Sequence, residues 1–214
     1  MNILSQKNSI LLNFLAEIRD ESIQKDRMRF RKNIYRIGEI MAYEISQSMS
    51  FKNTKVKTVL GEKETSVLRN QPVIVSIMRA GLPLHEGFLD FFDQADNAFI
   101  GAYRGTRDEE DHFDIEMDYI TSPDLRGREL IICDPMLATG KSLEIAYHAL
   151  LRFGIPSKTH FATVIASKKG ADFVSNRMPE CKLWIADLDL DLNDKSYIVP
   201  GLGDAGDLAF GLKN

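Results

Sequence analysis

The chain has 214 residues and a mass of 24.2 kDa, enough for one domain with a sizeable core. Hydrophobic residues make up 44% and charged residues 27%, as in soluble globular proteins, and no apolar run is long enough to cross a membrane. The net charge of -4 argues against non-specific nucleic-acid binding by the whole surface, and the N-terminus lacks a signal-peptide layout. We expect a cytoplasmic enzyme.

Two amphipathic helices are predicted at the start of the chain, over residues 9–19 and 24–48. The second opens with a basic run from Lys25 to Lys32, for which a solvated face is the first interpretation. An anion-facing or subunit-interface role is the alternative. Residues 55–60 then alternate polar and apolar side chains, which predicts a half-exposed strand.

A continuous apolar run over residues 72–78 predicts a central strand of a parallel sheet. It ends in Arg79, Ala80 and Gly81, and a helical pattern follows over residues 84–92. The guanidinium of Arg79 suits bidentate binding of pyrophosphate. A surface arginine at the edge of the sheet is the alternative.

A further strand is predicted over residues 97–104, followed by a segment with seven acids over residues 105–118. Few apolar anchors lie in this segment, which indicates a hairpin or flap over the end of the sheet, with a solvated loop as the alternative. Residues 159–166 and 183–188 predict two more strands, with a short helix near 171–176 between them.

The residues from 131 to 142 combine a strand, an acid, a loop of small residues and the start of a helix. The first N–H groups of a helix have no intrahelical partner and carry a positive partial charge, so they can hold a phosphate. Thr139 and Ser142 add hydroxyl donors, and Asp134 lies where a ribose or a metal-bound water would be. The alternative is an ordinary turn in which Thr139 or Ser142 caps the helix.

The tail over residues 197–211 contains four glycines, which expose backbone donors and acceptors at close quarters. That composition suits recognition of a small planar ligand by main-chain groups. A flexible terminal linker is the alternative, against which Ile198, Val199 and Leu202 argue.

The side chains outside these segments suggest no other chemistry. The cysteines, Cys133 and Cys181, lie in apolar runs without metal or redox spacing, so we expect buried, reduced thiols. The four histidines show no ligand spacing and are expected to be structural or exposed: His85, His112, His148 and His160.

Four motifs together resemble uracil phosphoribosyltransferase. They are DPMLATGKS (Asp134–Ser142), YIVPGLGDAGD (Tyr197–Asp207), IMRAGL (Ile77–Leu82) and GAYR (Gly101–Arg104). The resemblance runs from about Arg19 to the C-terminus. Other phosphoribosyltransferases commonly carry two adjacent acids where this chain has Cys133 and Asp134.

The resemblance implies an α/β protein of the type I phosphoribosyltransferase fold, with a mostly parallel central sheet flanked by helices. Residues 1–214 would form one domain, with N-terminal helices over about 9–48. A hairpin flap is expected over about 104–120, and a base-binding hood over about 197–211.

The implied reaction is magnesium-dependent: uracil and 5-phosphoribosyl diphosphate (PRPP) give uridine monophosphate (UMP) and pyrophosphate in pyrimidine salvage. Arg79 and Arg104 would meet the diphosphate, and Asp204 would face the donor through magnesium-bound water. Arg104 and Asp204 are the expected catalytic residues. The 5-phosphate and ribose would be held by Asp134, Pro135, Met136, Leu137, Ala138, Thr139, Gly140, Lys141 and Ser142. Uracil would be read by Tyr197, Ile198, Gly203, Asp204 and Ala205.

The chemistry agrees with this assignment. Uracil presents an acceptor–donor–acceptor edge that backbone groups can match, and cytosine would leave those groups unpaired. Catalysis then depends on holding the reactants in line and stabilising the leaving charge, without a protein nucleophile.

Three residues depart from the family pattern. Lys141 and Pro83 replace usual glycines, and Leu208 replaces a usual basic residue. The alternatives to an active enzyme are an RNA-binding regulator with this fold and an inactive paralogue. We expect a homodimer or higher homo-oligomer and no nucleic-acid partner.

Overall fold

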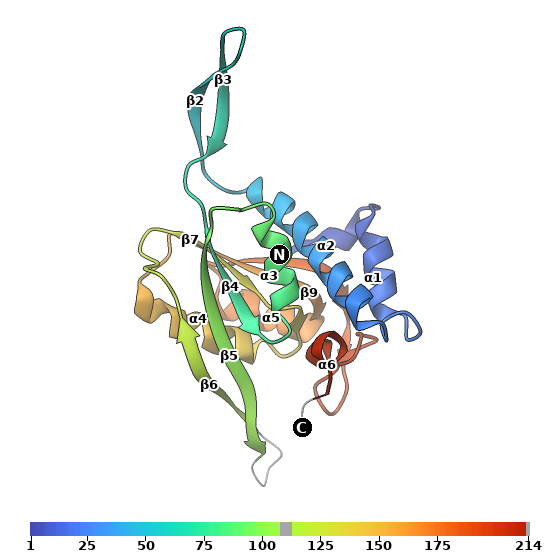
Figure 1. Ribbon diagram of the computed structural model, residues 1–214. Coiled ribbons are helices and arrows are strands. Elements are labelled where there is room, and N and C mark those ends of the chain that lie inside the picture. Colours follow the sequence, from blue (N-terminus) through green and yellow to red (C-terminus); the bar gives the residue numbers. More distant parts are fainter. Residues whose placement is uncertain (108–112, 213–214) are drawn as a thin grey trace.

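The computed structural model describes residues 1–107 and 113–212, and the side chains of residues 1–101 and 119–212 (Figure 1). In this part of the chain, eight strands form one central sheet. They are β1 (Asn2–Ile3), β4 (Val73–Met78), β5 (Asp96–Arg107), β6 (Phe113–Thr121), β7 (Glu129–Cys133), β8 (Met136–Leu137), β9 (Lys158–Ser167) and β10 (Lys182–Asp189). Their order is β1-β10-β9-β7-β4-β5-β6, and β8 pairs with β9.

Every neighbouring pair in this sheet is parallel except β5 and β6, which form an antiparallel hairpin. The predicted mostly parallel α/β architecture is therefore confirmed. The predicted hairpin is confirmed, whereas its role as a flap stays a prediction; the acidic residues 108–112 lie outside the described residues.

Helices cover both faces of the sheet (Figure 1). On one face lie α1 (Leu11–Arg19), α2 (Arg27–Ser46), α3 (Leu82–Leu89) and the short α6 (Ala205–Phe210); on the other lie α4 (Lys141–Leu150) and α5 (Lys168–Arg177). Alternate strand residues serve the two layers, so that Ile74 and Ile131 pack on the first and Val75 and Ile132 on the second. Burial on both faces explains the continuous apolar runs of β4 and β7. Two short 3-10 helices complete the set: Leu4–Gln6 and Leu151–Phe153.

The predicted helices are confirmed with shifted ends. The helix predicted over 84–92 begins at Leu82, because Pro83 is tolerated in a first turn where its missing N–H is not needed. Asp26 accepts a hydrogen bond from the N–H of Arg29 (3.0 Å) and so begins α2 three residues later than predicted.

The strand predicted over residues 55–60 is wrong in its bounds and its burial. The strand is β2 (Phe51–Lys57), which pairs with β3 (Glu62–Leu68) in an arm that stands away from the sheet (Figure 1). Val59 and Leu60 lie in the turn and are fully exposed. Alternation predicted a strand, but most of this arm is exposed, and only its end next to β4, at Leu68, packs partly buried against the core.

The basic run at the start of α2 is more than a solvated face. Arg29 pairs with Glu17 of α1, with a shortest distance of 2.5 Å. Nη1 of Arg31 donates to the carbonyl oxygen of Ala209 (2.6 Å), and its guanidinium lies over the ring of Phe210. The run therefore ties α2 to α1 and to the C-terminal helix.

The sheet has a topological switch point between β4 and β7. After β4 the chain moves through α3 to β5, whereas after β7 it moves through α4 to β9 on the other side. Ligands of such sheets bind outside the carboxyl ends of the strands at this point. Across the described residues, no helix is long and apolar enough to span a bilayer.

Candidate functional site

The loop after β7 is fixed to the neighbouring strand. The N–H of Asp134 donates to the carbonyl oxygen of Ala162 (3.1 Å), and the N–H of Ile165 donates to that of Pro135 (2.9 Å). β8 then pairs with β9, so the loop runs along the carboxyl end of the sheet before entering α4. Gly140 begins this helix in a left-handed conformation, with φ of +85°.

The start of α4 fits the predicted anion site. Among the described side chains, none caps this helix, so the alternative in which Thr139 or Ser142 is an ordinary N-cap is wrong. A Cβ on Gly140 would lie 2.7 Å from Cδ1 of Phe173, so glycine is required by packing as well as by φ. The first N–H groups of α4 therefore remain free of side-chain caps and can meet a phosphate.

The carboxyl group of Asp134 in this loop has a strongly raised pKa. Burial raises the pKa of its carboxyl group to about 7, although the N–H of Met136 donates to its Oδ1 (3.3 Å) and acts in the opposite direction. A carboxyl group that is costly to ionise in the free protein, at the carboxyl end of a strand, is typical of functional sites.

We expect Asp134→Asn to stabilise the free protein at pH 8. The folded carboxyl group keeps its proton up to about pH 7, whereas the unfolded one loses it near 3.8, so Asp134 destabilises the fold increasingly as pH rises through that window. Asparagine keeps the acceptor for Met136 without the charge. The free energy of unfolding should rise by about 2 to 4 kcal/mol at pH 8.

Urea unfolding of both proteins between pH 4 and pH 8 checks this prediction. The difference between the two free energies should shrink toward zero near pH 4. A difference that is independent of pH would contradict it.

The loop after β4 meets the loop after β7. A Cβ on Gly81 would lie 2.7 Å from the carbonyl oxygen of Cys133, so the two strand ends are in close contact. Nη2 of Arg79 lies 3.4 Å from Oδ1 of Asp207 and donates to the carbonyl oxygen of Gly211 (3.2 Å). Arg79 therefore stands between the sheet edge and the tail, with 40% of its side chain exposed.

Arg104, the second predicted diphosphate residue, lies on β5 beside β4. Its backbone pairs with Ile115 in the hairpin. Its side chain lies outside the described side chains.

The tail is ordered, so the alternative of a flexible linker is wrong. Two short strands, β11 (Asp191–Leu192) and β12 (Ile198–Val199), pair antiparallel at its start. Gly203 is exposed with φ of +94°, and α6 follows directly. Asp204 caps α6 by accepting a hydrogen bond from the N–H of Asp207 (3.0 Å).

The tail reaches the loop after β4. A Cβ on Gly206 would lie 3.9 Å from Cβ of Ala80 and 3.1 Å from Oδ1 of Asp204. Ile198 and Ala205 are buried, whereas Tyr197 is partly exposed. The loop over residues 134–140, the loop after β4 and the glycine-rich tail thus lie at the carboxyl end of the sheet.

Comparisons with known proteins agree with this arrangement. A family model described as uracil phosphoribosyltransferase matches residues 5–212. The chain belongs to the uracil phosphoribosyltransferase family. The uracil phosphoribosyltransferase of Porphyromonas gingivalis is 52% identical over 98% of this chain and 97% of its own.

Solved structures support the fold of this family. A protein of Aquifex aeolicus has a TM-score of 0.85 and 31% identity, with 96% of each chain covered. A purine phosphoribosyltransferase of Pyrococcus horikoshii has a TM-score of 0.50 and 14% identity, over 72% of this chain and 86% of its own, which shows the fold alone. The type I phosphoribosyltransferase fold is confirmed.

The three residues that depart from the pattern of uracil phosphoribosyltransferases all lie within regular helices. Lys141 is exposed at the first position of α4, and Pro83 lies in the first turn of α3. Leu208 packs partly buried against the core. A cation at the positive end of a helix is unfavourable by itself, and a bound anion would remove that cost at Lys141.

The sequence did not point to the residues that hold these loops in place. The hydroxyl of Ser167 donates to the carbonyl oxygen of Ala138 (2.5 Å) and accepts from the N–H of Gly170 (2.9 Å). The start of α5 therefore supports the loop over residues 134–140. Arg19, with Asp187 and Asp189, supports the tail. The one available signal was the spacing of these two acids, which puts both on one face at the carboxyl end of β10.

The sequence predicted structural or exposed histidines and buried, reduced cysteines. His85 and His160 are buried and His148 is exposed, which agrees with structural or exposed roles; His112 lies outside the described residues. Both cysteines are free, Cys133 buried and Cys181 only partly so. Among the described side chains, those of residues 1–101 and 119–212, no three acidic, histidine or cysteine side chains gather as metal ligands.

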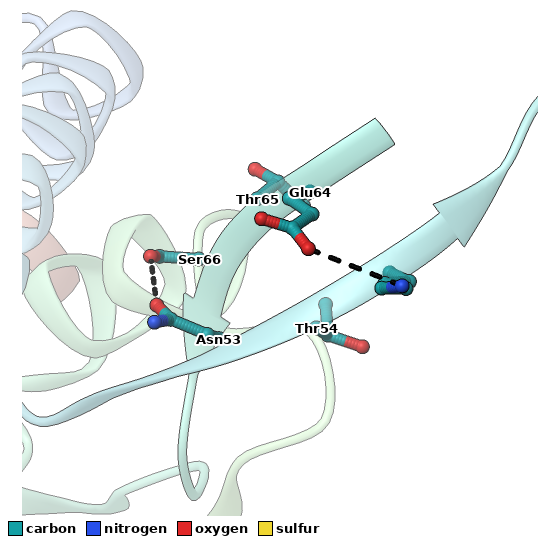
Figure 2. A pocket seen from close by; sticks show the side chains of 6 residues that line it. Asn53, Thr54, Glu64, Thr65 and Ser66 are labelled. Atoms are coloured by element: carbon teal, nitrogen blue, oxygen red, sulfur yellow. Dashed lines mark hydrogen bonds and ion pairs between the residues drawn. The ribbon is translucent and has the colours of Figure 1, made fainter. Parts of the chain in front are cut away.

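A hollow on the β2–β3 arm lies at the other end of the protein. Figure 2 shows that its lining side chains come from facing positions of the two strands: Asn53, Thr54, Lys55, Glu64, Thr65 and Ser66. Ser66 donates to Oδ1 of Asn53 (2.9 Å), so these groups satisfy one another. The arm leads into the amino end of β4, whereas Arg79 follows its carboxyl end, so the hollow is separate from the site.

Proposed function

We propose that this protein transfers the phosphoribosyl group of PRPP to uracil, giving UMP and pyrophosphate. The observation that carries this proposal is the placement of an uncapped helix start and a glycine-rich tail at the same end of the sheet, where the loop after β4 contacts both the end of β7 and the tail. The first suits a phosphate, and the second suits a planar base. Membership of the family supplies the two substrates.

In this proposal the loop over residues 134–140, which we call the phosphate loop, holds the sugar phosphate. The N–H groups at the start of α4 bind the 5-phosphate, with hydroxyl donors from Thr139 and Ser142. Asp134 accepts from the ribose hydroxyls, which gives its carboxylate partners that the free protein lacks. The remaining loop residues shape the cradle: Pro135, Met136, Leu137, Ala138, Gly140 and Lys141.

Arg79 and Arg104 bind the diphosphate, and Asp204 faces the donor from the tail. The guanidinium groups stabilise negative charge as the diphosphate leaves, with Arg79 acting from the carboxyl end of β4 and Arg104 from β5. Main-chain groups of Ile198, Gly203 and Ala205 read the uracil edge, and Tyr197 borders them. The attacking ring nitrogen and the anomeric carbon are held in line, which supplies much of the rate enhancement.

Magnesium is the proposed cofactor. Among the described side chains, carboxylates such as that of Asp204 do not cluster with other metal-binding groups. A single carboxylate fits a magnesium ion that is held mainly by phosphate oxygens and water. Bound with the donor, the ion would neutralise charge on the diphosphate.

We further propose a single catalytic domain in the cytoplasm that assembles as a homodimer or higher homo-oligomer. The β2–β3 arm supports assembly, because Phe51, Val56 and Val67 on it are exposed apolar side chains. Size-exclusion chromatography with light scattering would test it. A monomer at micromolar concentration would contradict it.

Pyrophosphate release from PRPP with magnesium, measured with each of four bases, tests the reaction. We expect release with uracil and none above background with cytosine or hypoxanthine, because mismatched edges leave the tail's backbone groups unpaired. Orotate presents the same edge as uracil, but its additional carboxylate lies beside the attacking nitrogen, and burying that charge without a partner is costly, so we expect no release with orotate either. Pyrophosphate release with hypoxanthine or orotate, and not with uracil, would show that the assignment of uracil as the substrate base is wrong. No release with any base from folded protein would favour the inactive paralogue or the RNA-binding regulator, which salt-dependent RNA binding would separate.

A further inference from the structure

Arg19, the last residue of α1, lies beneath the tail and makes four hydrogen bonds there. Its Nη1 donates to Oδ2 of Asp189 (2.9 Å) and to the carbonyl oxygen of Gly201 (2.8 Å). Its Nη2 donates to Oδ2 of Asp187 (2.7 Å) and to Oδ1 of Asp189 (2.9 Å). Two carboxylates at the end of β10 and one tail carbonyl thus share one guanidinium.

Gly201 is held from both sides of its backbone. Its N–H donates to Oδ2 of Asp189 (2.9 Å), and its carbonyl oxygen accepts from Arg19. Its φ is +58°, and a Cβ there would lie 2.1 Å from the carbonyl oxygen of Ile198, so only glycine fits. Gly201 stands three residues after Ile198 and two before Gly203, in the middle of the segment to which we assign uracil recognition.

Burial makes these contacts strong. The side chains of Arg19, Asp187 and Asp189 are 19%, 29% and 7% exposed, and each bond is charge-assisted. Burial alone would lower the pKa of Arg19, but hydrogen bonds to the two aspartates raise it, so the guanidinium stays charged. An exposed pair such as Arg79 with Asp207 contributes far less.

We propose that Arg19 is a positioning residue for the base: through Gly201 it sets where the tail presents its main-chain groups to uracil. We call Arg19, Asp187, Asp189 and Gly201 the Arg19 clamp. The clamp joins α1 and β10 to the tail, so the base-reading turn is fixed to the sheet edge that binds the donor. This inference rests on the proposed function.

The geometry requires arginine. A guanidinium offers a planar fork that bridges both aspartates and the Gly201 carbonyl at once, whereas a lysine ammonium is a single point charge. Arg19→Lys therefore keeps the charge between Asp187 and Asp189 but loses the bridge. If charge alone mattered, lysine would restore the function of an Arg19→Ala protein.

Steady-state kinetics of Arg19→Lys, with each substrate varied in turn, tests the clamp. We expect kcat/KM for uracil to fall by about tenfold or more, since small displacements of a bound reactant are costly, and KM for PRPP to stay within about twofold. Asp187→Asn should have a smaller effect, because Asp187 contacts Arg19 but not Gly201. Equal losses for both substrates, or wild-type uracil kinetics in Arg19→Lys, would overturn the inference.

Arg29→Lys is the matched control. Arg29 makes a similar bidentate pair with Glu17 of α1, at 2.5 and 2.9 Å, on the side of the helix pair that faces solvent. It tests whether weaker packing of α1 on α2 is enough to disturb uracil use. Kinetics in which this control matches Arg19→Lys would also overturn the inference.

Amide hydrogen exchange of residues 197–206 adds a readout that does not depend on activity. In Arg19→Lys we expect faster exchange in this segment than in wild type or Arg29→Lys. If the wild-type protein failed to use uracil, the proposed reaction would be wrong, and exchange would still decide whether Arg19 holds the tail. Unchanged exchange would refute the clamp even in an active enzyme.

Discussion

Asp204→Asn should lower kcat by about 100- to 1000-fold while the fold stays intact, because it removes a charge that we propose faces the donor. Asp204 is also the N-cap of α6, where its Oδ1 accepts from the N–H of Asp207. Asparagine is as good an N-cap as aspartate, so the helix and the tail should keep their conformation. The substitution thus separates the carboxylate's charge from its structural role.

Asp207→Asn is the matched control for this prediction. It makes the same chemical change three residues later, in the first turn of α6, and it removes only a partly exposed pair with Arg79. Its kcat should stay within about threefold of wild type. Thermal unfolding and pyrophosphate release, measured on both variants, check the result. Near-wild-type turnover in Asp204→Asn would contradict the assignment of Asp204 as a catalytic residue.

Arg79→Ala should reduce kcat/KM for PRPP by roughly 10- to 100-fold, the usual cost of losing a hydrogen-bond partner for a charged group. KM for uracil should change little, because Arg79 follows β4 while the base is assigned to the tail. Arg79→Lys should recover part of the loss, since it restores charge without the bidentate fork. Initial rates with each substrate varied would measure this.

Arg79 also donates to the carbonyl oxygen of Gly211, so its loss could act through the tail. In that case Arg79→Ala would raise KM for uracil as much as KM for PRPP. Such a pattern would contradict the diphosphate assignment and identify Arg79 as a tail contact.

Asp134 and Asp204, which we propose belong to one site, have opposite effects on stability. Burial makes Asp134 costly to ionise in the free protein, so its presence lowers stability at neutral pH. Asp204 instead stabilises the structure by capping α6. Stability is commonly traded for function at sites such as that of Asp134.

Much of the fold followed from local patterns. The apolar runs of β4 and β7 predicted strands buried on both faces, and the change to helical spacing after Lys141 predicted α4. The loop of small residues before α4 also followed from the local pattern; its binding of a phosphate stays a prediction that rests on the free N–H groups at a helix start. These features depend on the residues within one segment.

Other features could not be predicted, because they depend on partners distant in the chain. Alternation over residues 55–60 indicated a strand but could not show that the arm carrying it stands away from the core. The basic run of α2 could not be assigned, because Arg31 bonds a carbonyl 178 residues away. Hydrophobic periodicity predicts which face of a helix or strand is apolar, but it does not predict which element covers that face.

The sequence by itself determined the central strands, the helices apart from their exact ends, and the motifs from which the substrates are proposed, because local hydrophobic spacing and backbone chemistry specify them. Only the tertiary structure decided how these motifs are held together. Arg19 reaches Asp189 across 170 residues and Gly201 across 182. Such contacts form only when the parallel sheet brings the ends of β4, β7 and β10 to one edge, since the bonds depend on positions in space and not on spacing along the chain.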